Sequence, residues 1–166
     1  MDKHFYHSSF RERLIEHLFI GELLKFSWQQ DDCSLEISKP EVDSKGYDLI
    51  AELNQVIRHI QLKSTFTGSK TSVQKIHQAL GSKPSGCVIW IYFDKNTLEL
   101  GPFLFFGSNG GGPIQPLEEF PVAKHNKADS KGVKALRPNI HVIRKGQFTR
   151  FDSIREIYHC LFRGEN

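Results

Sequence analysis

Hydrophobic positions recur at helical spacing near the start of the chain. Between residues 10 and 28 they form one broad stripe, made up of Leu14, Ile15, Leu18, Phe19, Leu23 and Phe26. This spacing predicts a helix that packs on the core. At about 100° per residue, Glu22 falls near the middle of the stripe, whereas Glu16 lies about 100° from its centre. An inward Glu22 needs a cation, a metal ion or a hydrogen-bond donor; alternatively, it lies close enough to the helix end to reach water.

Runs of apolar and β-branched residues predict the strands. They occupy residues 34–38, 47–53, 56–63, 87–93 and about 98–106. The run 87–93 is apolar throughout, which is typical of a strand that is buried on both faces. Asn54 and Gln55 separate the second run from the third and supply a two-residue hairpin turn.

Two further segments show helical spacing. Residues 72–80 predict a short helix that ends at Gly81. Near the end of the chain Ser153 stands three residues before Glu156, which is the spacing of a capping box. The apolar residues that follow it predict a closing helix within residues 151–164.

The order of these elements predicts a mixed α/β fold, in which a mixed central sheet is flanked by helices. We expect a single domain over residues 1–166. Its core is expected in residues 10–93, followed by a loop-rich basic segment in 107–150 and the closing helix. No apolar run approaches the roughly 20 residues of a membrane helix, and the first ten residues lack the apolar stretch of a secretory signal. We therefore expect a cytoplasmic protein without a membrane partner.

Positive charge is concentrated in the second half of the chain. The net charge is only +3, but the stretch from Lys124 to Arg150 holds eight Lys or Arg residues and one acid. Such a cluster indicates a phosphate-binding footprint, with a solvated charged loop as the alternative. The residues expected to bind the nucleic-acid backbone are Lys124, Lys127, Lys131, Lys134 and Arg137.

Counting outward from the hairpin turn brings polar side chains together at the far end of the two strands. If Leu53 pairs with Val56, the same register sets Asp48 directly across from Gln61. Lys63, two residues further along, lies on the same face. A carboxylate, a carboxamide and an ammonium group are therefore expected to meet there. An ordinary ion pair between Asp48 and Lys63 at the sheet edge is the alternative.

These groups suit the hydrolysis of a phosphodiester bond. Mg²⁺ prefers oxygen ligands and is held by one or two carboxylates together with substrate phosphate. The candidate ligands are Asp48, the side-chain oxygen of Gln61, the carbonyl of Leu62, and Glu22 from the first helix. Lys63 is placed to orient or deprotonate the attacking water and to stabilise transition-state charge. We expect Mg²⁺, or Mn²⁺ in its place, as the cofactor.

The same residues resemble a known nuclease motif. Asp48, followed after twelve residues by Gln61-Leu62-Lys63 and preceded by a helix with an inward Glu22, is similar to the PD-(D/E)xK nuclease superfamily. In particular it resembles the branch with QxK in place of (D/E)xK, seen in Mrr-type restriction endonucleases, with a layout shared by archaeal Holliday-junction resolvases. The resemblance covers about residues 10–93. It implies a restriction-endonuclease-like fold and Mg²⁺-dependent cleavage of DNA, with these residues as catalytic ones.

Two positions depart from the superfamily pattern. Gly46-Tyr47 stands where the motif has a proline, and Gln61 replaces the acid of (D/E)xK, which removes one negative ligand. Catalytically inactive binding of nucleic acid or of a protein partner is therefore a second hypothesis, and an immunity or antitoxin-like protein with structural roles for Asp48 and Lys63 is a third. Since many members of the superfamily dimerise to cut both strands, a homodimer is one option for this chain.

Overall fold

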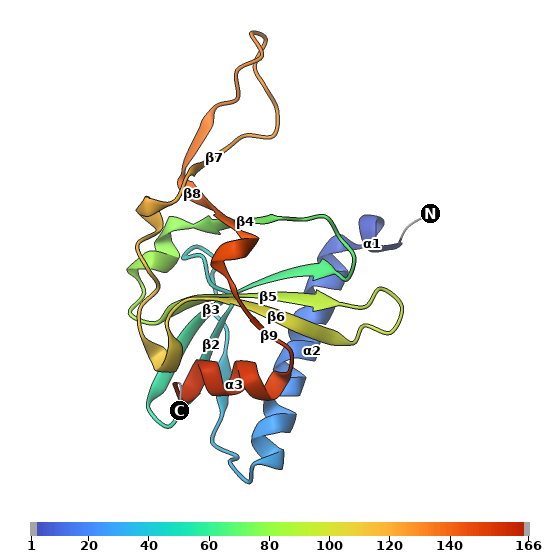
Figure 1. The fold of residues 1–166 in the computed structure, drawn as a ribbon, viewed down its shortest axis with the longest axis vertical. Helices are drawn as coiled ribbons and strands as arrows, with labels where there is room; N and C mark the ends of the chain where they lie inside the picture. The colour runs from blue at the N-terminus through green and yellow to red at the C-terminus, as the bar shows by residue number, and fades with distance from the viewer. Residues whose placement is uncertain (1–2, 165–166) are drawn as a thin grey trace.

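A six-stranded mixed sheet forms the centre of the fold (Figure 1). The computed structural model describes residues 3–164. In spatial order the strands are β1 (Glu36–Ser38), β2 (Leu49–Leu53), β3 (Val56–Phe66), β5 (Gly86–Phe93), β6 (Leu100–Phe106) and β9 (Thr149–Phe151). β3 and β5 run parallel, whereas the other neighbouring pairs are antiparallel. The expected mixed α/β fold is confirmed.

A smaller sheet of three antiparallel strands lies over one face of the central sheet. Its order is β4 (Val73–His77), β8 (Leu136–Arg144) and β7 (Val122–Lys124). In the described part of the chain, four short 3-10 helices accompany the two sheets: η1 (Gln78–Ser82), η2 (Asn109–Gly111), η3 (Leu117–Glu119) and η4 (Lys145–Gln147). Side chains of β4, β8, η1 and η3 pack with β5 and β6 in one buried cluster. The segment 107–150, which we expected to be loop-rich, thus contributes two of the three strands of this second layer, β7 and β8.

Within residues 3–164, three α-helices complete the fold: α1 (Lys3–Tyr6), α2 (Ser8–Gln29) and α3 (Ile154–Phe162). α2 and α3 pack on the face of the central sheet opposite the small sheet, where their apolar side chains form the second buried cluster. The central sheet is therefore covered by helices on one face and by strands on the other, rather than by helices on both. The closing helix begins as predicted, because Ser153 and Glu156 form the capping box.

The prediction of a short helix at 72–80 is wrong for most of that segment. Residues Val73–His77 form β4, and only Gln78–Ser82 turns as a 3-10 helix. β8 pairs with β4 along its whole length and supplies its hydrogen-bond partners. Tertiary pairing therefore overrides the local helical spacing, whose apolar residues Ile76 and Leu80 are buried in either conformation.

The hairpin forms in the predicted register. Leu53 lies opposite Val56, and the ladder continues outward to Leu49 opposite Ile60. Asn54 and Gln55 take positive φ angles of 48° and 72°, as a two-residue turn of the hairpin type requires. β3 continues beyond the start of β2, so its second half pairs with β5 alone.

The part of the chain that the structure describes contains no helix that is both long enough and apolar enough to cross a membrane.

Candidate functional site

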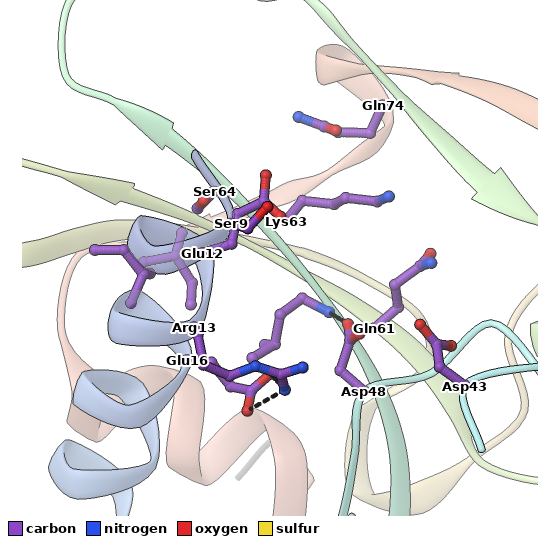
Figure 2. Close-up of a pocket in the computed structure, with 13 residues that line it drawn as sticks. Ser9, Glu12, Arg13, Glu16, Asp43, Asp48, Gln61, Lys63, Ser64 and Gln74 are labelled. Atoms are coloured by element: carbon purple, nitrogen blue, oxygen red, sulfur yellow. Dashed lines mark hydrogen bonds and ion pairs between the residues drawn. The ribbon is translucent and has the colours of Figure 1, made fainter. Parts of the chain in front are cut away.

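A cleft of about 510 Å³ opens where β3 extends past β2. The first half of α2 forms one wall, and the loop before β2 together with β4 forms the other (Figure 2). Polar side chains line most of it: Glu12, Arg13 and Glu16 from α2, Asp43 and Asp48 from the loop, Gln61 and Lys63 from β3, and Gln74 from β4. The cleft is therefore a polar site at the interrupted edge of the sheet.

The structure brings Asp48, Gln61 and Lys63 to this cleft, together with Leu62. The backbone N–H of Asp48 donates to the carbonyl of Ile60 at 2.8 Å, which extends the hairpin ladder by one residue beyond β2. The backbone N–H of Leu62 in turn donates to Oδ2 of Asp48 at 2.7 Å. The two strands thus hold the carboxylate beside Gln61, and Gln61 and Lys63 project to the same side of β3 (Figure 2).

Burial raises the pKa of Asp48 above its ordinary value. The hydrogen bond from Leu62 and the charge of Lys63 act in the opposite direction, whereas the negative charges of Asp43 and Glu16 raise the pKa of Asp48 further. A half-buried carboxylate among other acids favours a bound proton or a bound cation. The electrostatics of the cleft therefore favour an added positive charge beside Asp48.

Burial also lowers the pKa of Lys63, and the carboxylates of Asp48, Glu12 and Asp43 raise it only in part. Among the ion pairs of residues 3–164, none joins Lys63 to Asp48. The simple ion pair that we considered as an alternative is thus not the arrangement found. A half-buried ammonium group without a fixed partner is suited to binding an anion or to exchanging a proton.

Gln61 carries an unusual buried acceptor. Its side-chain oxygen is enclosed, and it accepts no hydrogen bond from the described part of the chain. An unsatisfied buried polar group costs about 1–3 kcal/mol. A ligand that supplies a donor or a positive charge in the cleft would offset this cost.

Glu16 is the buried acid of α2. The residue is 7% exposed, and its carboxylate forms ion pairs with Arg13, at 3.2 Å, and with Lys39. Figure 2 shows Arg13 and Glu16 on the helix wall of the cleft, facing the side that carries Asp48. Glu12, one turn earlier on α2, lines the same cleft and is exposed.

Glu22, which we expected in this site, is not brought to it. Its side chain is 42% exposed and pairs with Lys25 at 3.7 Å, and it borders a separate cavity on the far side of α2 with Leu14 and Leu18. The stripe used to orient the helix included these two leucines, which are only half-buried. The fully buried face is displaced from them toward Glu16, and it consists of Ile15, Glu16, Phe19, Leu23, Phe26 and Ser27.

One signal in the sequence could have identified the acids of the cleft. Glu12 and Glu16 are four residues apart, so they lie on one face of the helix. Ile15 and Phe19, on the adjoining face, are the first two apolar residues of the buried stripe. Asp43 and Gln74 carried no such signal, because their approach depends on a loop and on the pairing of β4 with β8.

The donors of the cleft fit a hard cation by their chemistry. Asp48 and Glu16 are carboxylates, and Gln61 offers an unsatisfied carbonyl oxygen. Mg²⁺ is commonly held by one or two carboxylates and keeps several water ligands. The described residues do not form a preformed metal cage, however. Within residues 3–164 no group of three or more His, Cys, Asp or Glu side chains is arranged to hold a metal ion.

The predicted DNA-binding cations lie outside the cleft. Lys124, Lys127, Lys131 and Lys134 are exposed on or beside the connection between β7 and β8, and Arg137 is half-buried on β8. This connection projects from the body at the top of Figure 1. It shares its sheet with β4, which supplies Gln74 to the cleft.

No family model matches the chain, and no curated protein matches it significantly in sequence. Among solved structures, a bacterial homing endonuclease, I-Ssp6803I, matches with a probability of 1.00. The two chains are 15% identical, and the match covers 74% of this chain and 78% of the other with a TM-score of 0.38. A likeness of this degree supports no conclusion about activity, so a function for this chain rests on the cleft itself.

Proposed function

We propose that the protein is a metal-dependent nuclease that hydrolyses phosphodiester bonds of DNA in the cleft of Asp48, Gln61 and Lys63. One observation carries the proposal: the hairpin and α2 bring a carboxylate, an unsatisfied carboxamide oxygen, a lysine and the buried acid Glu16 into one cleft. Hydrolysis of a phosphodiester bond uses groups of these kinds. Three of them, Asp48, Gln61 and Lys63, are also the residues that resemble the QxK branch of the PD-(D/E)xK superfamily.

Mg²⁺ or Mn²⁺ would be held by Asp48, by the side-chain oxygen of Gln61 and by the carbonyl of Leu62, with Glu16 in the role first given to Glu22. When bound, the ion neutralises charge on the scissile phosphate and lowers the pKa of a bound water. The chain prepares this site in two ways. Leu62 orients the Asp48 carboxylate. Burial above all, and then the charges of Asp43 and Glu16, raise the pKa of Asp48, so a cation beside the carboxylate would stabilise its ionised form.

Lys63 is proposed to act on the attacking water and on the phosphate. Burial lowers the pKa of Lys63, so more of its neutral amine is present near neutral pH than for an exposed lysine. The neutral amine can accept a proton from water, and the ammonium form can stabilise charge on the phosphoryl oxygens. Arg13, exposed at the wall of the cleft, is available to contact the backbone beside the scissile bond.

The test is cleavage of DNA by the purified chain. Supercoiled, linear, single-stranded and branched DNA would be incubated with Mg²⁺, with Mn²⁺ and with EDTA. Asp48→Asn and Lys63→Met keep the approximate size of each side chain and remove its charge. We expect cleavage with either metal ion, none with EDTA, and a loss of at least about 100-fold in each variant.

Glu22→Gln is the matched control, since it removes an acid from the same helix outside the cleft. Its cleavage rate should equal that of the wild type. Cleavage that persists in both Asp48→Asn and Lys63→Met would exclude this cleft as the active site. Activity that is unchanged by EDTA would exclude the metal-dependent reaction.

Binding of nucleic acid without cleavage is the second candidate function. The observation in its favour is that Arg13 and Lys39 already neutralise Glu16, in a chain where Gln61 replaces the motif acid. Tight binding of DNA by a wild-type protein that cleaves none of the substrates with either metal ion would establish this function in place of hydrolysis.

A further inference from the structure

The chain between β7 and β8 forms a projecting arm, which we define as residues 122–141. Figure 1 shows it extending from the small sheet, away from the central sheet and from both long helices. Every residue from Lys124 to Leu136 is exposed. The two sides of the arm are joined by the pairing of Lys124 with Leu136 and by a bond from the His125 N–H to the Ala135 carbonyl at 2.8 Å. Beyond its base the arm is thus an exposed hairpin, in which strand pairing reaches Lys124 and Leu136 and residues 125–135 form no strand.

A bulge at the base directs the arm away from the body. Val122 pairs with His141, but Ala123 pairs with Arg137, so three residues of β8 (138–140) have no counterpart on β7. Extra residues of this kind bend a strand and strengthen its twist. Ala123 and His141 are buried at 1% and 3% exposure, which anchors the ribbon immediately below the bend.

The tip of the arm is held in shape by its one acid. Oδ1 of Asp129 accepts hydrogen bonds from the backbone N–H groups of Lys131, at 2.9 Å, and Val133, at 2.8 Å. The carboxylate of Asp129 is thereby directed to the backbone rather than to a cation. Within residues 3–164 no ion pair involves a cation of the arm. From Lys124 to Arg137 there are five basic residues and one acid, a net charge of +4.

The arm also exposes apolar side chains. Val133 at the tip and Leu136 on β8 are each 60% exposed. A two-stranded ribbon standing alone is marginally stable in water. Nothing in the described chain covers these side chains, and the cations around them suit an anionic partner with apolar groups of its own.

We propose that the arm enters the major groove of duplex DNA, with its lysines on the phosphates and Val133 against the base edges. This proposal rests on the proposed function, because that function makes DNA the partner. It adds that the DNA is a duplex and that the arm is the surface that contacts it. The major groove of B-DNA is about 12 Å wide and admits a two-stranded ribbon, and the methyl group of thymine offers an apolar contact there. The major groove of duplex RNA is too narrow for side chains to read, and a single strand has no groove.

The arm is linked to the cleft through the small sheet. Nζ of Lys75 on β4 donates to Oδ1 of Asn126 in the arm at 3.2 Å. Gln74, the residue before it, lines the cleft. β4 pairs with β8 over five residues, so the small sheet carries both the arm and the wall of the cleft that holds Gln74. The arm would thus set which phosphate lies in the cleft.

Binding without metal tests the proposal independently of cleavage. Fluorescence anisotropy of the full chain in EDTA would compare a duplex DNA with its single strand and with the duplex RNA of the same sequence. We expect the duplex DNA to bind at least about tenfold more tightly than either. Equal affinity for duplex RNA or for the single strand would overturn the proposal.

The triple variant Lys127→Ala, Lys131→Ala, Lys134→Ala tests the surface. We expect weaker binding of duplex DNA and a salt dependence reduced by about 3 in the slope of log K against log salt, because three phosphate contacts are lost. The matched control is Lys25→Ala, Arg155→Ala, Arg163→Ala, which removes three exposed cations outside the arm: Lys25 on α2, Arg155 on α3 and Arg163 directly after α3. Figure 1 shows α3 far from the arm, at the opposite end of the molecule. An equal loss in the control, or no loss in the arm variant, would overturn the assignment.

Blocking each groove separately tests the mode of binding. A duplex whose cytosines carry glucosylated 5-hydroxymethyl groups has a filled major groove, and a duplex saturated with a minor-groove ligand has a filled minor groove. We expect the first to lose binding and the second to keep it, and the opposite result would refute groove entry as proposed. If the wild-type protein binds duplex DNA in this manner but cleaves none of the substrates, the proposed role of the arm is supported and the proposed nuclease activity is excluded.

Discussion

The backbone N–H of Leu62 donates a 2.7 Å hydrogen bond to Oδ2 of Asp48, which links the end of the first hairpin strand to the strand that carries Gln61 and Lys63. The other carboxylate oxygen of Asp48 accepts no hydrogen bond from residues 3–164. The hairpin therefore orients the carboxylate and leaves one of its oxygens for a ligand. Asp48 is in this way placed for chemistry at some cost in stability, since its ionised form is half-buried among other acids.

Asp48→Asn should stabilise the folded chain at pH 7. Burial raises the pKa of Asp48 in the folded state, so its stabilising contribution is present below the unfolded pKa of 3.8 and is lost as pH rises through the folded value. At pH 7 the ionised carboxylate is therefore unfavourable, and Asn removes the charge while it keeps an acceptor for Leu62. Urea unfolding should give a higher free energy of unfolding for the variant at pH 7 and a smaller difference at pH 4. A variant less stable than the wild type at pH 7 would contradict this account of the carboxylate.

Glu16→Gln and Glu22→Gln should separate the two acids of α2. Glu16 is buried at the cleft, whereas Glu22 pairs with Lys25 beside another cavity. We expect Glu16→Gln to lower the rate of DNA cleavage by about 10- to 100-fold, the range seen when groups that support a metal site are removed, and Glu22→Gln to leave it unchanged. Single-turnover rates at saturating metal provide the measurement, with circular dichroism to confirm folding. If Glu22→Gln lowered the cleavage rate and Glu16→Gln did not, Glu22 rather than Glu16 would belong to the active site.

Arg58→Met should destabilise the fold strongly. Arg58 is fully buried, and its guanidinium donates to the carbonyls of Leu161 at 2.8 Å, Cys160 at 3.3 Å and Ser108. It thereby holds the last turn of α3 against the loop after β6. Loss of these bonds leaves several buried carbonyls unsatisfied, for an expected cost of about 3 kcal/mol.

The matched control for Arg58→Met is Arg155→Met, an exposed position on α3. Its effect should stay within about 0.5 kcal/mol. Chemical denaturation of both variants gives the comparison, and similar stabilities for the two would show that Arg58 is not a structural link.

Gly86→Ala should also destabilise the fold, by about 1–3 kcal/mol. A Cβ atom at Gly86 would lie 2.6 Å from the carbonyl oxygen of Leu80 and 3.2 Å from its Cγ, where η1 crosses the start of β5. Gly146→Ala is the control, since a Cβ there meets nothing within 4 Å. Thermal unfolding should show a lower midpoint for the first and no decrease for the second. Equal midpoints would mean that η1 can move away from β5 without cost.

Prediction from sequence succeeded where the interactions are local. The turn at Asn54 and Gln55 sets the register of the hairpin, because strands joined by two residues leave little freedom in how they pair. The capping box at Ser153 is local in the same sense. Counting residues outward from this turn was sufficient to predict that Asp48 lies beside Gln61.

Prediction failed where partners far apart in the chain decide the outcome. Helical spacing at 72–80 gave no warning that β8, about sixty residues later, pairs with this segment. The apolar stripe of α2 is broader than the face that the sheet covers, so the stripe alone could not show whether Glu16 or Glu22 faces inward. In both cases the energy gained by pairing or burial with a distant element exceeds the local preference.

By itself, the sequence determined the order of most elements, the hairpin register and the meeting of Asp48, Gln61 and Lys63, because period, turn chemistry and capping act within a few residues. Only the tertiary structure decided which acid of α2 joins them and that the basic segment forms a projecting ribbon. Those outcomes depend on how α2 is rotated on the sheet and on the pairing of β8 with both β4 and β7. Packing and strand pairing between distant segments settle both, and the local periodicity of the chain does not decide either one.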